Sequence, residues 1–301
     1  MRIFLTGATG FIGKAVAAQL MAVGHQVIGL TRSQQGAETL AAAGVEAHFG
    51  DLEDLDSLRG GAASSDGVIH TAFNHDFSTF IANCEKDQLA IGAMAGVLKG
   101  TQRPLLITSA VGLGSSGQNV LAVENYFNAE HQNPRKASEL AGINALKEGV
   151  NVSVIRLSQV HDPLKQGLIT PLIEIARQKG FSAYPEDGQN CWSAVHLSDA
   201  ALLYVLALEK NIAGSRYHAV AEEGITMRKI AETIGYILDV PVVSIDAAKT
   251  AEHFGWMSKF VAQDMSASGA ITQQQLKWQP QGPDLVSDLE RMRTHAWAPG
   301  S

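Results

Sequence analysis

Cysteine and charge are both scarce in this sequence of 301 residues. It has only two cysteines, Cys84 and Cys191, which are too few for a disulfide framework and lack the Cys/His spacing of a zinc site. We therefore expect buried free thiols and no metal. Charged residues make up 18% of the chain and hydrophobic residues 46%. Such a chain can bury a large core, which excludes a disordered polypeptide.

Long apolar runs and an excess of positive charge are also missing. No hydrophobic stretch approaches the roughly 20 residues of a membrane span, and the first residues do not resemble a signal peptide. Acidic residues outnumber basic ones by 30 to 23, giving a net charge of -7, which argues against nucleic acid as the main partner. We expect a cytoplasmic protein that acts on a small molecule, without membrane or nucleic-acid binding.

Strand and helix patterns alternate through the first half of the chain. Short apolar runs predict strands over residues 2–6, 26–30, 45–49, 67–71, 104–108 and 152–157. Apolar residues at helical spacing predict helices over residues 11–23, 35–43, 54–59, 76–98 and 137–148. Alternating strands and helices form crossover units, so the sequence predicts an α/β fold with a Rossmann-type, doubly wound parallel sheet.

The pattern changes after Leu157, where turn signals become frequent. Further helices are predicted over residues 197–209, 226–238 and 285–294. The length corresponds to about two domains at ~150 residues each. We predict a nucleotide-binding domain over residues 1–160, with its sheet completed by later segments around 190–220. Residues 161–301 are predicted to form a smaller, mainly helical substrate-binding region.

Three glycines spaced three residues apart follow the first predicted strand. The segment reads Thr6-Gly7-Ala8-Thr9-Gly10-Phe11-Ile12-Gly13 and opens the first predicted helix. A dinucleotide pyrophosphate needs a tight turn, no side chain at its closest approach and free amides at a helix N-terminus. Gly7 and Gly10 can supply the turn and the approach, while Gly13 lets the helix pack on the strand. An ordinary flexible turn is the alternative, but the flanking strand and helix favour a dinucleotide.

The end of the second predicted strand distinguishes between dinucleotides. An acidic residue there would accept the ribose hydroxyls of NAD(H), whereas an arginine pairs with the 2′-phosphate of NADP(H). This chain reads Gly29-Leu30-Thr31-Arg32-Ser33 and has no carboxylate nearby. NADP(H) is therefore favoured over NAD(H). The alternative for Arg32 is a solvated loop arginine.

With these motifs, the chain resembles the extended short-chain dehydrogenase/reductase family over nearly its whole length. Besides the glycine motif, the resemblance rests on Gly50-Asp51-Leu52-Glu53-Asp54, His70-Thr71-Ala72, Thr108-Ser109-Ala110, Arg156-Leu157-Ser158-Gln159-Val160 and the segment from Trp192 to Ala200. The resemblance implies that Asp51 and Leu52 contact adenine, that Thr71 and Ala72 line the middle of the cofactor, and that Leu157 to Val160 lie near the nicotinamide. Capping of the following turn is the alternative for Asp51. The cofactor contacts expected from the motif and the resemblance are Gly7, Thr9, Gly10, Phe11, Ile12, Gly13, Arg32, Asp51, Leu52, Thr71, Ala72, Thr108, Arg135, Lys136, Leu157 and Val160.

The chain departs from the family at the catalytic tyrosine. Family members that move a hydride use a tyrosine acid/base, with a lysine four residues later that lowers its pKa. If Lys136 takes the lysine position, Gln132 takes that of the tyrosine. If Glu139 is aligned with a glutamate common in the family, Arg135 replaces the lysine and His131 the tyrosine. Neither register contains the tyrosine.

Four residues remain candidates for catalysis, namely Ser109, Tyr126, His131 and Lys136. A third hydroxyl residue common in the family falls at Ala110, so Ser109 would have to reach the substrate oxygen. His131 can exchange protons near neutral pH, and Tyr126 is the tyrosine just upstream. The alternatives are a surface histidine and a packed aromatic. Arg135 or Lys136 would retain a ribose or phosphate contact.

The expected substrate pocket combines three segments. The loop Phe73-Asn74-His75-Asp76-Phe77 follows the fourth predicted strand, at the sheet edge where ligands bind, and capping of the following long helix by Asp76 is the alternative to pocket lining. His161 and Trp192 are the other candidates. A turn is the alternative for His161, and plain core packing is the alternative for Trp192.

These features predict an atypical NADP(H)-dependent reductase or dehydrogenase acting on a small carbonyl or alcohol. The alternatives are a non-catalytic NADP(H)-binding sensor, and a cofactor-assisted epimerase or isomerase without net redox change. As in many relatives, helix pairing would make a homodimer.

Overall fold

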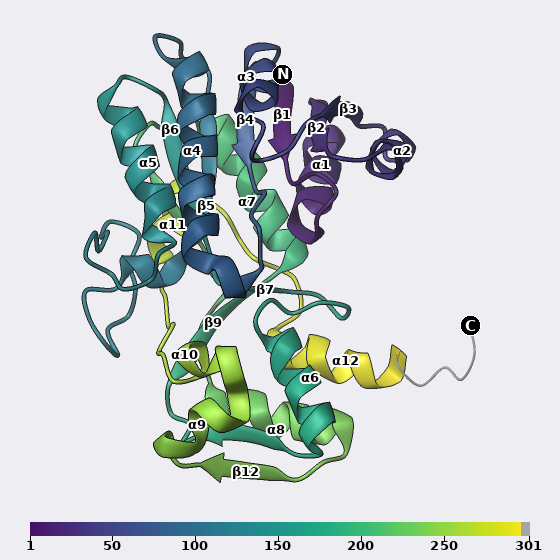
Figure 1. Ribbon diagram of the computed structural model, residues 1–301, viewed down its shortest axis with the longest axis vertical. Coiled ribbons are helices and arrows are strands. Elements are labelled where there is room, and N and C mark those ends of the chain that lie inside the picture. The colour runs from purple at the N-terminus through teal and green to yellow at the C-terminus, as the bar shows by residue number, and fades with distance from the viewer. Residues whose placement is uncertain (296–301) are drawn as a thin grey trace.

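The computed structural model describes residues 1–295 and has a large and a small lobe (Figure 1). The strands of the large lobe are β1 (Arg2–Thr6), β2 (Gln26–Thr31), β3 (Glu46–Phe49), β4 (Gly67–His70), β5 (Leu105–Ala110), β6 (Val152–Leu157) and β10 (Arg216–Ala219). Its helices are α1 (Phe11–Ala22), α2 (Gln34–Ala42), α3 (Leu55–Ala63), α4 (Phe80–Leu98), α5 (Lys136–Lys147), α7 (Leu197–Lys210) and α11 (Ala270–Leu276), with short 3-10 turns at Phe77–Thr79 and Val111–Gly114.

The seven strands of the large lobe form one parallel sheet in the order β10-β6-β5-β4-β1-β2-β3. This confirms the predicted doubly wound sheet. The order reverses between β1 and β4, so the carboxyl ends of these two strands border the crevice where such folds bind ligands. The last strand, β10, comes from beyond residue 160 and pairs with β6.

Alternate residues of the central strands supply two apolar cores. Ile3 and Leu5 of β1 pack with α1 and α7 on one face, whereas Phe4 packs with α3 and α4 on the other. Helix α5 covers the same face as α4, as Figure 1 shows. The side-chain alternation of a strand thus fixes which helix covers which face.

The small lobe contains strands as well as helices. It comprises β7 (Gln159–His161), α6 (Ile169–Lys179), β8 (Ser182–Pro185), β9 (Cys191–His196), β11 (Glu222–Thr226), α8 (Met227–Leu238), β12 (Val242–Ile245), α9 (Ala247–Phe254), a 3-10 turn at Gly255–Met257, α10 (Ser258–Val261) and α12 (Leu285–His295). A three-stranded sheet has the order β11-β9-β7, and β12 pairs with β8. The region predicted as mainly helical therefore also carries two small sheets, whose strands of three to six residues are too short for a clear apolar alternation.

Within residues 1–295, every helix is too short or too polar to cross a membrane.

Candidate functional site

The glycine-rich turn leaves β1 and packs on the loop after β4. Gly7 has a φ of +74°, and its carbonyl accepts a hydrogen bond from the Gly10 amide at 2.8 Å. A Cβ on Gly7 would lie 2.7 Å from Thr71 Oγ1 and 2.8 Å from the Ala72 amide nitrogen. Only glycine combines this left-handed backbone with so close an approach.

Helix α1 begins at the same turn with its first amides uncovered. Gly10 caps the helix without a side-chain hydrogen bond, and no acidic residue lies in the first turn. A Cβ on Gly13 would stand 2.0 Å from the Gly7 carbonyl oxygen, so the helix sits directly against the turn. The uncovered N–H groups and the positive end of the helix dipole suit a phosphate.

The contact at Gly13 gives a first prediction. Gly13→Ala is expected to lower the free energy of unfolding by about 1–3 kcal/mol, because the added methyl group displaces the turn. Gly96→Ala is the control: it lies inside α4 with nothing within 4 Å of its Cβ, and it should raise stability by about 0.5–1 kcal/mol. Urea unfolding measures both, and equal changes in the two variants would contradict the packing argument.

Arg32 stands at the end of β2, beside an open pocket of about 490 Å³. Phe49, Gly50 and Asp51 also line this pocket, together with Glu53 and Asp54. The carboxylates are engaged elsewhere. Asp51 accepts the amides of Glu53 and Asp54 at 2.6 and 3.3 Å, Glu53 pairs with Lys86 at 2.7 Å, and Asp54 caps α3.

Arg32 itself is exposed and makes no hydrogen bond or ion pair with another residue among those that the structure describes. The acidic side chains nearest to it in the pocket are held in turns, a cap and a salt bridge. The guanidinium is therefore free to bind an anion entering the pocket.

A buried polar network links the glycine-rich turn to α5. Thr6 Oγ1 lies 2.7 Å from His70 Nδ1, and His70 Nε2 lies 2.9 Å from Asp87 Oδ1. The other Asp87 oxygen accepts Arg135 Nη1 at 2.5 Å and Ser138 Oγ at 2.6 Å. Burial by itself raises the pKa of Asp87, but the Arg135 charge, the neighbouring His70 and the hydrogen bonds from His70 and Ser138 outweigh it and hold that pKa below its usual range.

The Arg135 side chain, rather than that of Lys136, reaches the end of β5. Its Nη2 donates to the Thr108 carbonyl at 3.0 Å, and its guanidinium lies 3.9 Å from the centre of the Phe73 ring. The Lys136 side chain makes no hydrogen bond or ion pair within the described part of the chain. The Arg135 guanidinium is thus buried against Asp87, Thr108 and Phe73, whereas the Lys136 side chain is unpaired.

Ser109 and Thr108 both turn away from solvent. Ser109 Oγ donates to Glu139 Oε1 at 2.9 Å, and Glu139 also binds Arg156 and Arg216. Thr108 Oγ1 lies 2.7 Å from the Tyr204 hydroxyl. The Ser109 hydroxyl is therefore committed to the core rather than to a substrate.

His131 and Tyr126 lie in the loop between β5 and α5. His131 is half-buried, and its Nδ1 accepts the Asn133 amide at 3.0 Å, so the neutral ring carries its proton on Nε2. Burial lowers the pKa of His131, and the positive charge of Lys136 lowers it further. Tyr126 is 40% exposed, while its carbonyl accepts Arg156 Nη1 at 2.8 Å.

The loop after β4 carries an aromatic cluster that reaches the small lobe. The Phe73 and His75 rings meet edge to face at 5.4 Å, and Phe77 stacks on Trp256 at 4.6 Å. Asn74 is exposed and accepts the Asp76 amide. Burial lowers the pKa of His75, as do the positive charges of Arg135 and Lys165. Phe73 and His75 thus lie together with Arg135.

Other expected contacts lie in the core. His161 is fully buried, with Nδ1 2.8 Å from Asp288 Oδ2, and Trp192 is fully buried and donates to the Gln263 carbonyl. Neither side chain can meet a substrate without displacing this packing. Leu52 and Leu157 pack partly against the two apolar cores, and Val160 is buried in one of them.

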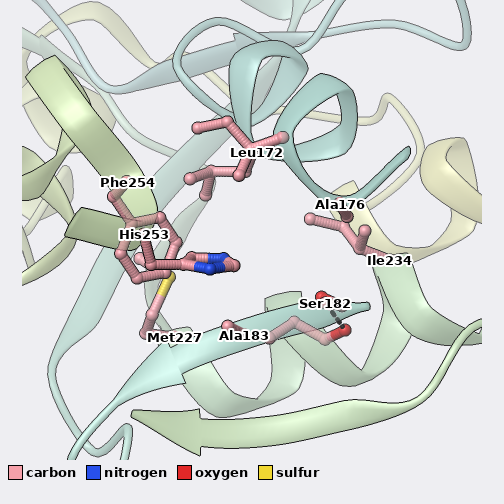
Figure 2. Close-up of a pocket in the computed structure, with 10 residues that line it drawn as sticks. Leu172, Ala176, Ser182, Ala183, Met227, Ile234, His253 and Phe254 are labelled. Carbon is pink, nitrogen blue, oxygen red and sulfur yellow. Dashed lines mark hydrogen bonds between the residues drawn. The ribbon is translucent and has the colours of Figure 1, made fainter. Parts of the chain in front are cut away.

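An enclosed space in the small lobe is too small for a substrate. It lies among Leu172, Met227, Ile234 and Phe254 (Figure 2). Its volume is about 10 Å³. That is the room of about one water molecule. Among the described residues, no group of three His, Cys, Asp or Glu side chains could hold a metal ion.

Asp87, Ser138 and Lys165 were not predicted from the sequence. Asp87 had a usable signal, because it stands on the buried face of a long helical pattern between Cys84 and Ala90. A charged side chain there needs a buried partner. Ser138 and Lys165 carry no local signal, since their neighbours come from distant segments.

Comparison with known proteins gives matches over the whole chain. Residues 3–90 match the NAD dependent epimerase/dehydratase family. Uncharacterized protein C2A9.02 of Schizosaccharomyces pombe is 47% identical, over 96% of this chain and 98% of its own length. Streptomyces venezuelae DesIV, a dTDP-glucose 4,6-dehydratase solved with NAD, covers 99% of both chains with a TM-score of 0.76 and 20% identity. The human epimerase family protein SDR39U1, solved with NADPH, covers 98% of this chain and 99% of its own with a TM-score of 0.74 and 18% identity.

Proposed function

This chain belongs to the NAD dependent epimerase/dehydratase family of extended short-chain dehydrogenases/reductases, and from that premise we propose that it is an NADP(H)-dependent oxidoreductase acting on a small carbonyl or alcohol. The observation that carries the choice of cofactor is the free guanidinium of Arg32, beside a pocket whose carboxylates are engaged elsewhere. A 2′-phosphate entering this pocket would meet a guanidinium fork suited to it.

The glycine-rich turn suits the pyrophosphate, which lies at the opposite end of the adenosine from the 2′-phosphate pocket. A side chain on Gly7 would collide with the loop after β4, and the first amides of α1 have no side-chain cap. Gly7, Gly10 and the first residues of α1 would hold the pyrophosphate. Human SDR39U1, which was solved with NADPH, shows that a protein of this fold accommodates that cofactor.

When bound, the nicotinamide supplies or accepts a hydride. In this proposal the protonated His131 ring donates the accompanying proton from Nε2 to the substrate oxygen and is left neutral with its proton on Nδ1, so protonation displaces the Asn133 amide that Nδ1 accepts in this structure. Arg135, fixed by Asp87 and Thr108, provides positive charge where relatives carry the lysine. Phe73 and His75 lie next to that charge and would line the substrate side.

Cofactor selection is tested by Arg32→Ala. We expect the Kd for NADPH to rise about tenfold to a hundredfold, the usual range for a lost charge-assisted contact, and the Kd for NADH to stay unchanged. Tryptophan or NADPH fluorescence titration measures both constants. Arg59→Ala is the control, since Arg59 is another exposed arginine of the large lobe, paired with Asp56. Tighter binding of NADH than NADPH by the wild type would refute the choice of cofactor.

Turnover is tested with a panel of aldehydes and ketones. Oxidation of NADPH, followed at 340 nm, is expected with at least one of them. Substrate conversion without a net change in NADPH would instead indicate an epimerase or isomerase. Tight NADPH binding with no conversion of any compound would favour a sensor.

A further inference from the structure

One lysine of the small lobe, Lys165, extends toward the glycine-rich turn of the large lobe. Residues 162–168, called here the 162–168 loop, connect β7 to α6. Lys165 in this loop places its Nζ 5.7 Å from the centre of the Phe11 ring, and Phe11 is the first residue of α1. In Figure 1 the connection between β7 and α6 extends from the small lobe toward the foot of α1.

The backbone of this loop is held in place from several sides. Asp162 Oδ1 accepts the amides of Leu164 and Lys165, each at 2.8 Å. Gln166 is fully buried and donates to the Asp162 carbonyl at 2.9 Å. Gly167 has a φ of +56°, and a Cβ there would stand 2.7 Å from Gln159 Oε1. The backbone of Lys165 is therefore held in place, and its side chain extends to Phe11 at the start of α1.

Lys165 has no counter-charge in this position. It forms no ion pair within residues 1–295, and the first turn of α1 contains no acidic residue. Burial is the main cause that lowers the pKa of His75, and the positive charges of Arg135 and Lys165 lower it further. Lys165 therefore lies near His75 as well as Phe11. Among the described residues, Lys165 is exposed and its ammonium contacts the Phe11 ring alone, so an anion bound at the positive end of α1 would supply the counter-charge that it lacks.

We propose that Lys165 contacts the pyrophosphate of the bound dinucleotide, so that the small lobe supplies a charge that holds the cofactor against the glycine-rich turn. This inference rests on the proposed function, because it requires a dinucleotide at α1. The contact is one ammonium–phosphate interaction between the lobes. Cofactor affinity would therefore depend on the position of the 162–168 loop, which belongs to the small lobe.

The test compares two ligands in direct binding, with no enzyme turnover involved. NADPH contains the pyrophosphate, whereas adenosine 2′-monophosphate keeps the 2′-phosphate and lacks the pyrophosphate. Lys165→Gln is expected to raise the Kd for NADPH about tenfold and to leave the Kd for adenosine 2′-monophosphate unchanged. Lys165→Arg should restore most of the NADPH affinity, since it keeps the charge. The loss in Lys165→Gln should shrink as salt screens the contact.

Lys249→Gln is the matched control, because it removes another exposed positive charge from the small lobe, on α9. It should change neither constant. Wild-type NADPH affinity in Lys165→Gln would overturn the inference while leaving the proposed function intact. Equal weakening of both ligands would also overturn it, because the effect would then lie outside the pyrophosphate. A wild type that binds neither NADPH nor NADH would remove both proposals.

Discussion

His131→Phe is expected to lower kcat/KM for carbonyl reduction by about 10²- to 10⁴-fold, the usual contribution of a positioned general acid. The Kd for NADPH should not change, because His131 lies outside the glycine-rich turn and the Arg32 pocket. Steady-state NADPH oxidation with the substrate found in the panel measures the first quantity, and fluorescence titration the second. The aromatic replacement fills the half-buried site, so packing is largely retained.

Tyr126→Phe is the control for this experiment. It removes the phenol of the other candidate acid, whose ring is already 40% exposed. We expect less than about a threefold change in kcat/KM, well below the contribution of a general acid. The opposite outcome, with loss in Tyr126→Phe and retention in His131→Phe, would assign the acid to Tyr126.

The pH profile gives an independent check on His131. Burial and the neighbouring Lys136 lower the pKa of its ring, so the protonated acid forms only below the usual value of 6.5. Reduction should therefore speed up as the pH falls through that lowered pKa, and alcohol oxidation should speed up as the pH rises through it. Lys136→Gln removes a positive neighbour and should move both limbs to higher pH. His131→Phe should flatten them.

Asp87→Ala is expected to destabilise the fold by about 3–5 kcal/mol, because it leaves the buried Arg135 guanidinium without its carboxylate. Urea unfolding at pH 7 measures this change. Glu53→Ala, which breaks the exposed pair with Lys86, is the control and should cost less than about 1 kcal/mol. Similar losses in the two variants would show that the Asp87 network does not support the fold.

The Asp87 network also predicts how stability depends on pH. The folded-state pKa of this carboxyl is depressed by Arg135 and His70 in spite of its burial. Its contribution is therefore present above the unfolded-state pKa, near 3.9, and is lost as the pH falls toward the lower folded-state value. Asp87→Asn should remove this part of the acid destabilisation. An unchanged acid limb in that variant would contradict the assignment.

Local sequence patterns were sufficient to predict those features that depend on residues close together in the sequence. The alternating sheet and the Gly7–Gly13 turn follow from short-range spacing, and both the fold class and the family resemblance are confirmed. Strand pairing in the small lobe could not be predicted, because its short strands find partners far along the chain. β12 pairs with β8, and β9 lies between β7 and β11.

The sequence by itself determined the parallel sheet, the glycine-rich turn and the arginine at the end of β2, because each depends on a few consecutive residues. It left Arg135 and Lys136 as equal candidates, and only tertiary packing turned Arg135 toward Asp87, a residue 48 positions away. Packing also buried His161 and Trp192 and brought Lys165 to Phe11. The physical reason is that a side chain's direction and protonation depend on what surrounds it in space. Those surroundings come from segments that only the completed fold brings together.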